Sequence, residues 1–222
     1  MLDAGCGSGG VTRLLAERLP RGRVIAVDGS AAMAGEATAR LADLARVRVV
    51  HMDLLDLALP APVDAVFSSA VFHWIHDHER LFRRLAEALA PGGRMAAQCG
   101  GAGNVAGVLA AAREVAAEAP YTALAGFGRT WSFATAGATR ARLAEAGFVE
   151  TRTWLAPADV HLAAGEEAER YLATVVLRDH LAALQEPLRE GFTRLVAERL
   201  REPDGRVRLD YVRLNIDARR AP

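Results

Sequence analysis

The feature that most constrains the fold lies at the N-terminus, where an acidic residue is followed by a glycine-rich run and then by a helical pattern. The run reads Asp3-Ala4-Gly5-Cys6-Gly7-Ser8-Gly9-Gly10, and the apolar spacing from Val11 to Leu19 predicts a helix directly after it. Glycine removes the side chain where a backbone turns sharply or approaches a ligand, and the helix directs its N-terminal amides at that space. The run is typical of a nucleotide-binding loop between a strand and a helix.

Two kinds of nucleotide ligand fit the spacing of this loop. Gly5, Gly7 and Gly10 satisfy the pattern G-x-G-x-x-G, and Asp28 follows at the distance expected in a dinucleotide-binding unit. A carboxylate two residues before the first glycine would repel a pyrophosphate, whereas it would attract a ligand that carries an ammonium and a sulfonium group. Asp3 therefore favours S-adenosylmethionine over NAD, and an NAD-dependent oxidoreductase remains the alternative.

Composition excludes several other classes. All 27 basic residues are arginines, which removes Schiff-base chemistry, pyridoxal phosphate attachment and a P-loop lysine. A formal net charge of +0 gives no electrostatic case for nucleic acid, so a small-molecule or protein-borne acceptor is expected. No stretch has the length and apolar character of a membrane span or a signal peptide, and Cys6 and Cys99 form neither a disulfide framework nor a zinc pattern. These observations predict a cytoplasmic protein.

Alternating strand and helix patterns run through the first hundred residues. Alternation of this kind predicts an α/β fold with a parallel sheet, whose ligands bind beyond the carboxyl ends of the strands. Ser30 and Asp77 are expected to cap helices, and Pro91-Gly92-Gly93 to end one. The predicted strands are 1–4, 23–27, 47–52, 63–68 and 94–99, the predicted helices are 11–19, 31–44 and 78–89, and the residues at the carboxyl ends are Asp3, Asp28, Asp53, Ser68 and Gln98.

The remainder of the chain predicts a cap and a closing pair of strands. The stretch with Tyr121, Phe127, Trp131 and Phe133 has the character of a lid or pocket wall. We expect one domain over 1–222, with a cofactor-binding half at 1–100 and a substrate cap with closing strands at 101–222. The predicted elements are helices at 105–118, 138–146, 166–178 and 187–201 and strands at 148–155 and 206–218.

An acidic residue followed by Gly-x-Gly-x-Gly resembles the first motif of the class I S-adenosylmethionine-dependent methyltransferases. The resemblance implies a doubly wound, Rossmann-like, mostly parallel sheet with an antiparallel last strand. It also implies that Asp28 bonds the two ribose hydroxyls and that Asp53 and the backbone amide of Leu54 meet the adenine, with Asp56 as an alternative to Asp53. The expected cofactor-binding residues are Asp3, Gly5, Cys6, Gly7, Gly9, Asp28, Gly29, Met33, Asp53, Leu54, Ser68 and Ser69.

The first strand is short for a central strand, because only residues 1–4 precede the loop. Members of the family usually carry one or two helices before this strand. We therefore expect the chain to be truncated at its N-terminus or to begin at an internal start codon.

The segment from Ser69 to His78 is the expected acceptor site. It resembles the trans-aconitate methyltransferase group of small-molecule methyltransferases, with His73 where a glutamine would stand, and the resemblance covers nearly the whole chain. His73 is a general base if the acceptor is a hydroxyl or an acidic carbon, an orienting contact if it is a carboxylate, or neither. A metal site built from His73, His76, Asp77 and His78 lacks a recognised ligand spacing.

The resemblance implies O-methylation of a carboxylate as the leading reaction. Methylation of a carbon, an amine or the acid of a thioester carrier on the same scaffold remains open, as does a module that binds the cofactor without catalysis. Oligomeric state cannot be read from the sequence. The expected substrate residues are His73, Trp74, Tyr121, Arg129, Trp131 and Arg178.

Overall fold

The computed structural model describes residues 1–127 and 131–222, and it divides the chain into two compact units. Unit 1 comprises Met1–Ala102, Trp131–Ala156 and Arg213–Pro222, and unit 2 comprises Gly103–Thr130 and Pro157–Val212. Unit 1 thus adds two later segments to the predicted cofactor half. The division of labour between a cofactor half and a substrate cap within one domain stays a prediction.

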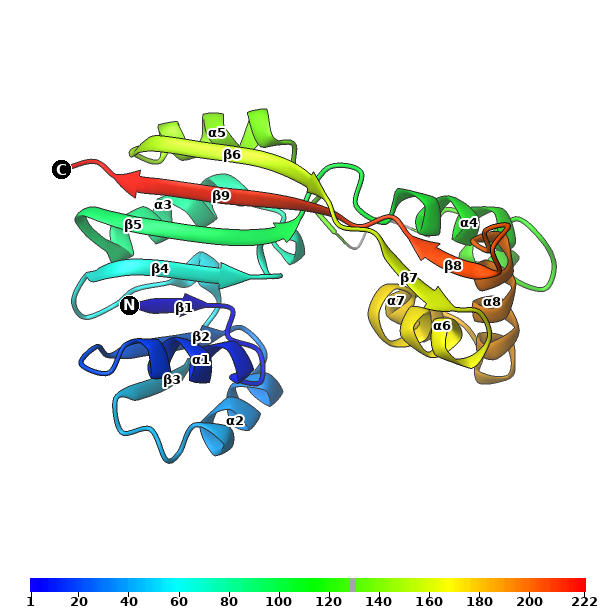
Figure 1. Cartoon of the computed structure of the whole chain (residues 1–222), viewed down its shortest axis with the longest axis horizontal. Helices are drawn as coiled ribbons and strands as arrows, with labels where there is room; N and C mark the ends of the chain where they lie inside the picture. Colours follow the sequence, from blue (N-terminus) through cyan, green and yellow to red (C-terminus); the bar gives the residue numbers. More distant parts are fainter. Residues whose placement is uncertain (128–130) are drawn as a thin grey trace. The chain divides into compact units, whose positions relative to one another are not determined.

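Unit 1 is built on a seven-stranded sheet in the order β3-β2-β1-β4-β5-β9-β6 (Figure 1). The first five of these strands are parallel, whereas β9 runs antiparallel to β5, with pairs from Arg94↔Arg219 to Gly100↔Arg213. This topology confirms the predicted α/β class and the antiparallel last strand. The strands are β1 (Leu2–Ala4), β2 (Val24–Asp28), β3 (Val47–His51), β4 (Val63–Ser69), β5 (Leu89–Gly100), β6 (Phe148–Pro157) and β9 (Val212–Arg220).

Helices pack on both faces of this sheet: α1 (Gly10–Arg18) and α2 (Ala31–Arg40) lie on one face, over β2 and β3, and α3 (His78–Ala88) and α5 (Ala136–Glu145) lie on the other (Figure 1). The face that carries α1 and α2 is open over β5 and β9 (Figure 1). The larger core lies under α3 and α5, where Leu85 and Leu143 are fully buried. Ser30 and Asp77 accept the backbone N–H groups of Met33 and Arg80, which confirms both predicted caps. Two short 3₁₀ turns, η1 (Leu54–Asp56) and η2 (Phe72–Trp74), follow β3 and β4.

Unit 2 is mainly helical, with a two-stranded antiparallel sheet of β7 (Val160–Ala163) and β8 (Arg206–Leu209). In the described part of the chain, no helix has the length and apolar character needed to cross a membrane. The helical elements of unit 2 are α4 (Ala106–Ala116), η3 (Thr122–Leu124), α6 (Glu166–Tyr171), a π-helical turn η4 (Leu172–Val176), α7 (Arg178–Ala182) and α8 (Glu186–Arg199).

Several predicted boundaries are wrong. The strand expected at 206–218 is two strands in different sheets, because the Asp210 backbone carbonyl accepts the N–H of Val105 and its carboxylate accepts the N–H of Gly107. Asp210 therefore turns away to cap α4, a long-range contact that alternation cannot reveal. Pro91-Gly92-Gly93 lies inside β5, the helix expected at 31–44 ends at Arg40, the one expected at 166–178 changes to a π-helical turn after Tyr171, and β7 was not predicted.

Candidate active site

The glycine loop is held in place by the end of β2. The backbone N–H groups of Gly5 and Cys6 donate to the carbonyl of Val27 over 2.8 and 2.9 Å, and the N–H of Gly9 donates to the carbonyl of Cys6 over 3.0 Å. Gly5, Gly7 and Gly9 have φ angles of +84°, +53° and +84°. Residues with a side chain rarely adopt this left-handed region, so the turn depends on glycine at all three positions.

The surroundings of the three glycines differ. A Cβ at Gly5 would lie 2.2 Å from Cγ2 of Val71, and one at Gly9 would lie 2.9 Å from Cδ1 of Leu41. A Cβ at Gly7 would meet no atom within 4 Å. Gly5 and Gly9 therefore permit packing of the loop against its neighbours, whereas Gly7 faces the open space that a ligand can enter.

Asp28 lies at the end of β2 with its carboxylate fixed by the loop. One oxygen accepts the backbone N–H of Gly7 over 2.8 Å, and the other accepts the N–H of Ser30 over 2.9 Å. Each carboxylate oxygen can accept a second hydrogen bond, so both remain able to bind hydroxyl groups. This geometry fits the diol-binding role expected for Asp28.

Asp3 lies beneath the loop and is only 1% exposed. Its Oδ2 accepts the hydroxyl of Thr12 over 2.6 Å. Burial raises the pKa of Asp3, the Thr12 hydrogen bond lowers it, and the charge of Asp28 raises it. Asp3 therefore holds α1 through Thr12, and its carboxylate is almost fully shielded from the loop surface. Sequence reasoning missed Thr12, although it stands in the first turn of the predicted helix.

Asp53 and Asp56, the two candidate carboxylates after β3, have different partners. The Oδ1 of Asp53 accepts the N–H of Leu55 over 2.8 Å and caps η1, while the side chain is exposed. Asp56 is instead paired with Arg80. Asp53 also lies next to Gly29, since a Cβ at Gly29 would be 4.0 Å from the Asp53 Cα. The structure thus brings Asp53, rather than Asp56, beside the end of β2.

Three further expected cofactor residues differ in accessibility. Ser68 is fully buried, and its hydroxyl donates to the carbonyl of Ala4 over 2.7 Å, which ties β4 to β1. Ser69 is exposed. Burial, followed by the charges of Asp3 and Asp28, raises the pKa of the Cys6 thiol to about 12, so it stays protonated. Ser69 is therefore the better placed of the two serines to meet a ligand.

His73 sits in the turn after β4 with one ring nitrogen already engaged. Its Nδ1 accepts the backbone N–H of Gly100 over 3.2 Å, which places the proton of the neutral ring on Nε2. Burial, then the charges of Arg213 and His78, lowers the pKa of His73 from 6.5 to about 4. The ring is therefore neutral at pH 7, and its Nε2–H is a hydrogen-bond donor.

Four rings form a contiguous aromatic wall that we define as His73, Trp74, Trp131 and Phe133. The ring centroids of His73 and Trp74 are 5.3 Å apart, and those of Trp74 and Trp131 are 5.6 Å apart. Phe133 stacks on Trp131 at 5.7 Å and lies 6.0 Å from His73. The structure thus brings together three of the six predicted substrate residues, and Phe133 of the predicted pocket wall packs beside them.

The other predicted substrate residues are not part of this wall. Tyr121 is buried in unit 2, where its ring packs edge-to-face on Phe192 at 5.4 Å. Arg178 also belongs to unit 2, has a side chain that is 69% exposed, and lies 3.6 Å from a carboxylate oxygen of Asp179. Arg129 lies outside the described residues.

No metal-binding cluster supports the alternative at the same loop. Within residues 1–127 and 131–222, no group of three or more His, Cys, Asp or Glu side chains is arranged to hold an ion. His78 is instead buried, with Nε2 2.9 Å from the carbonyl of Phe72. Asp77 is engaged as the cap of α3.

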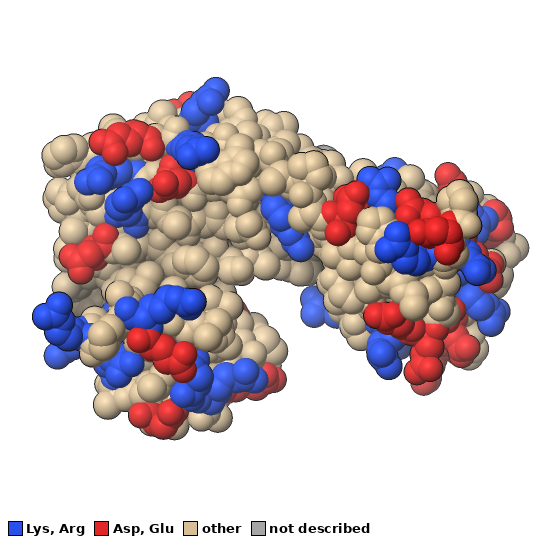
Figure 2. Space-filling view, viewed as in Figure 1, with Lys and Arg blue, Asp and Glu red and all other residues tan. Residues whose placement is uncertain are grey.

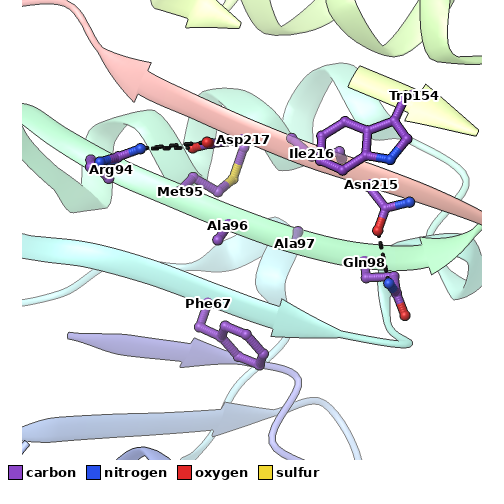
Figure 3. A pocket seen from close by; sticks show the side chains of 10 residues that line it. All are labelled: Phe67, Arg94, Met95, Ala96, Ala97, Gln98, Trp154, Asn215, Ile216 and Asp217. Carbon is purple, nitrogen blue, oxygen red and sulfur yellow. Dashed lines mark hydrogen bonds and ion pairs between the residues drawn. The ribbon is translucent and has the colours of Figure 1, made fainter. Parts of the chain in front are cut away.

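The open face of the sheet carries a shallow hollow of about 400 Å³ (Figure 3). Trp154 overhangs it, and two cross-strand polar pairs, Gln98–Asn215 and Arg94–Asp217, line it. None of the expected cofactor residues lines it. Figure 2 shows that the surface over these strands is largely uncharged toward its middle, with arginine and acidic side chains gathered near the end of β9.

The family model described as a methyltransferase domain matches residues 1–93. The trans-aconitate 2-methyltransferase of Methylobacterium nodulans is 32% identical over 237 residues, a match that covers 99% of this chain and 86% of that protein. The same enzyme of Afipia carboxidovorans is 41% identical over 96 residues, which cover 43% of this chain and only 36% of that protein.

Solved structures share the fold. The phosphoethanolamine N-methyltransferase 2 of Haemonchus contortus, solved with phosphomonomethylethanolamine and S-adenosylhomocysteine, superposes with a TM-score of 0.62 at 22% identity and covers 100% of this chain and 48% of that one. The YcgJ protein of Bacillus subtilis gives a TM-score of 0.66 at 15% identity, covering 100% and 91%. These matches do not favour the alternative of an NAD-dependent oxidoreductase.

Proposed function

Because the chain belongs to the class I S-adenosylmethionine-dependent methyltransferases, we propose that it transfers a methyl group from S-adenosylmethionine to a carboxylate oxygen of a small organic acid. The name of its full-length relative, a trans-aconitate 2-methyltransferase, supports an acid as the acceptor. The single observation that carries the choice of a carboxylate is that the imidazole of His73 accepts the N–H of Gly100 at Nδ1 and is neutral at pH 7.

The loop residues fit the family's cofactor. The open space at Gly7 would admit a ligand against bare backbone, and the fixed carboxylate of Asp28 would accept hydroxyl groups. Asp53, at the neighbouring strand end, would meet the adenine side. When bound, S-adenosylmethionine supplies a methyl group activated by a sulfonium centre, and the buried charge of Asp3 would favour such a cation.

His73 is better suited to hold an oxygen anion than to remove a proton. A residue with a pKa near 4 is a weak base at neutral pH, and its Nδ1 is already occupied by the N–H of Gly100. A hydroxyl or carbon acceptor must lose a proton during methylation, whereas a carboxylate is already ionised. The neutral Nε2–H therefore suits an acceptor that needs orientation and no base.

The chain's own contribution to the reaction is alignment and shelter from water. Direct displacement requires acceptor and methyl group in line, and holding the two together replaces a bimolecular encounter. The aromatic wall would exclude water from one side of the acceptor, and His73 would fix its orientation by one hydrogen bond.

The test is methyl transfer from methyl-labelled donor to a panel of acids, alcohols and amines. We expect transfer to di- or tricarboxylates, and a product that releases labelled methanol in mild base, as a methyl ester does. We also expect the turnover number to vary little between pH 6 and 8, since no group titrates as an essential base.

Two results would contradict the proposal. A base-stable methylated product would point to carbon or nitrogen methylation on the same fold. Tight binding of S-adenosylhomocysteine without transfer to any member of the panel would favour a module that binds the cofactor without catalysis.

A further inference from the structure

Thr12 lies on the side of α1 that packs on the sheet. Thr12 and Ala16 are both 0% exposed, and their spacing of four residues places them on the same face of the helix. Valine has nearly the same shape as threonine and would pack against the sheet equally well. Packing therefore accounts for the shape of the Thr12 side chain, whereas its hydroxyl needs another explanation.

The partner of this hydroxyl is Asp3, the middle residue of β1. The two residues that flank Asp3 in β1 belong to the core under α3 and α5, so alternation along the strand places the Asp3 side chain on the face that carries α1. The Thr12 Oγ1 donates to Oδ2 of Asp3 over 2.6 Å, a distance typical of a hydroxyl bonded to an ionised carboxylate. The residues paired with Asp3 across the sheet, Ala26 and Phe67, are apolar. Thr12 thus supplies a polar contact to a carboxylate whose neighbours in the sheet supply none.

Three titratable groups beside the glycine loop, Asp3, Cys6 and Asp28, lie close enough to affect one another. Burial raises the pKa of Asp3, the Thr12 hydrogen bond lowers it, and the charge of Asp28 raises it. Burial, followed by the charges of both carboxylates, raises the pKa of the Cys6 thiol, which stays protonated. The loop is therefore accompanied by two negative charges, and Thr12 stabilises the more deeply buried one.

Methyl transfer changes the charge of the ligand expected at this loop. The bond between sulfur and the methyl carbon breaks with its electron pair passing to sulfur, while an oxygen of the acceptor forms the new bond to that carbon. S-adenosylmethionine therefore carries one positive charge more than its product, S-adenosylhomocysteine. A fixed negative charge near the loop stabilises the donor more than the product.

We propose that Thr12 is a positioning residue of the donor site, which fixes the Asp3 carboxylate beneath the glycine loop and so makes the loop prefer the charged donor to the uncharged product. This inference rests on the proposed function and adds how the protein exchanges product for donor. Because Asp3 is shielded from the loop surface, its effect is electrostatic and falls on donor binding more than on the transfer step. Loss of the Thr12 hydroxyl should raise KM for the donor and strengthen inhibition by the product, with kcat changed less.

Calorimetry on the full chain with sinefungin and S-adenosylhomocysteine measures this preference without turnover. Sinefungin carries an ammonium group where the product has its uncharged sulfur, so the ratio of the two affinities reports the preference for positive charge there. We expect Thr12→Val to lower this ratio about 3- to 10-fold at pH 6.5 and less at pH 8.5, because Asp3 without its hydroxyl partner takes up a proton more readily. Thr12→Ser, which keeps the hydroxyl, should retain the ratio of the wild type.

Two further variants separate charge from packing. Asp3→Asn removes the charge and keeps the shape, so it should lower the ratio at both pH values, with no further loss when Thr12→Val is added. Thr139→Val is the matched control, because it removes another fully buried threonine hydroxyl from a helix of unit 1 and should leave the ratio unchanged. Denaturant unfolding checks that each variant folds, and Thr12→Ala provides the same test if Thr12→Val does not.

A Thr12→Val variant that weakens both ligands by the same factor at both pH values would show that Thr12 has only a structural role, and would overturn the inference. An unchanged ratio in Asp3→Asn would overturn it as well. The expected ratios without methyl transfer to any acceptor would instead refute the proposed function and leave the role of Thr12 in place.

Discussion

At His73, burial and the neighbouring guanidinium act in the same direction, since both lower the pKa of the imidazole. A ring that donates through Nε2 can be replaced by a side chain that also donates. We expect His73→Gln to keep methyl transfer within a few-fold of wild type. His73→Phe should lower kcat/KM about 10- to 100-fold, the range for a lost hydrogen bond to an anion.

The measurement is kcat/KM against an acid acceptor from pH 5.5 to 8.5 for the wild type and both variants. A general base would give the opposite pattern, with His73→Gln as inactive as His73→Phe. Affinity for S-adenosylhomocysteine, which should be unchanged in both variants, serves as the control.

The carboxylates at the strand ends should contribute unequally to cofactor binding. Asp28→Ala should weaken S-adenosylhomocysteine binding at least about 10-fold, because it removes two acceptors and the support of the Gly7 amide. Asp53→Ala should weaken it less, and Asp56→Ala hardly at all, since Asp56 is paired with Arg80. Calorimetry of the three variants tests this order. A larger loss for Asp56→Ala than for Asp53→Ala would reverse the assignment at the end of β3.

At the scale of elements, the glycine loop and the turn after β4 meet through Gly5 and Val71. Gly5→Ala should destabilise the fold by about 2 to 4 kcal/mol, since it combines a left-handed φ with a clash in the core. Gly7→Ala should cost only about 1 to 2 kcal/mol, because its left-handed φ is the sole penalty. Denaturant unfolding measures both.

Ligand affinity should rank the same two variants in the other order. Gly7→Ala should lose S-adenosylhomocysteine binding while it stays folded, because the added methyl group enters the open space. Gly5→Ala combined with Val71→Ala should regain part of the stability that Gly5→Ala loses. If Gly7→Ala bound the ligand normally, the cofactor could not lie against this glycine.

The sequence predicted the parallel strands of unit 1 well because each short apolar run ends in a polar residue or a turn. Local signals also predicted the caps at Ser30 and Asp77, since a cap acts within four residues. By contrast, local signals do not predict the direction in which a side chain points at the end of a strand. Asp3 was expected to bind the cofactor, which stays a prediction, and its hydrogen bond with Thr12, nine residues later, was not foreseen. The position of Arg213 in the sheet likewise depends on its pairing with Gly100, 113 positions earlier in the chain.

For the whole molecule, residues after 100 were harder to predict than those before. Their helices were expected, but the break at Asp210 arises from its contacts with Val105 and Gly107 far earlier in the chain. A continuous alternating pattern over 206–218 reads the same for one strand as for two. The division into two units follows from such contacts, and no change in amino-acid composition indicates where one unit ends and the other begins.

Acid stability is a property of the whole molecule, because each unit contains at least one histidine whose pKa is lowered by burial. Burial lowers the pKa of His73 and His78 in unit 1 and that of His180 in unit 2. In the unfolded chain these rings bind protons near their ordinary pKa of 6.5. The contribution of these histidines to the free energy of unfolding is therefore fully present above about pH 6.5. It falls as the pH decreases, because the unfolded state takes up protons first.

For His73 alone, the free energy of unfolding falls as the pH decreases from 6.5 to about 4, and the loss reaches about 3 kcal/mol at the lower pH. The two units can be followed separately, since all three tryptophans lie in unit 1 and all three tyrosines in unit 2. We expect tryptophan fluorescence in urea titrations to show stability falling from pH 7.5 to 5, and His73→Gln to flatten that decline. His180→Gln should flatten the tyrosine signal and leave the tryptophan signal unchanged. A wild-type stability that rises as the pH falls from 7 to 5 would show that these histidines gain protons on folding.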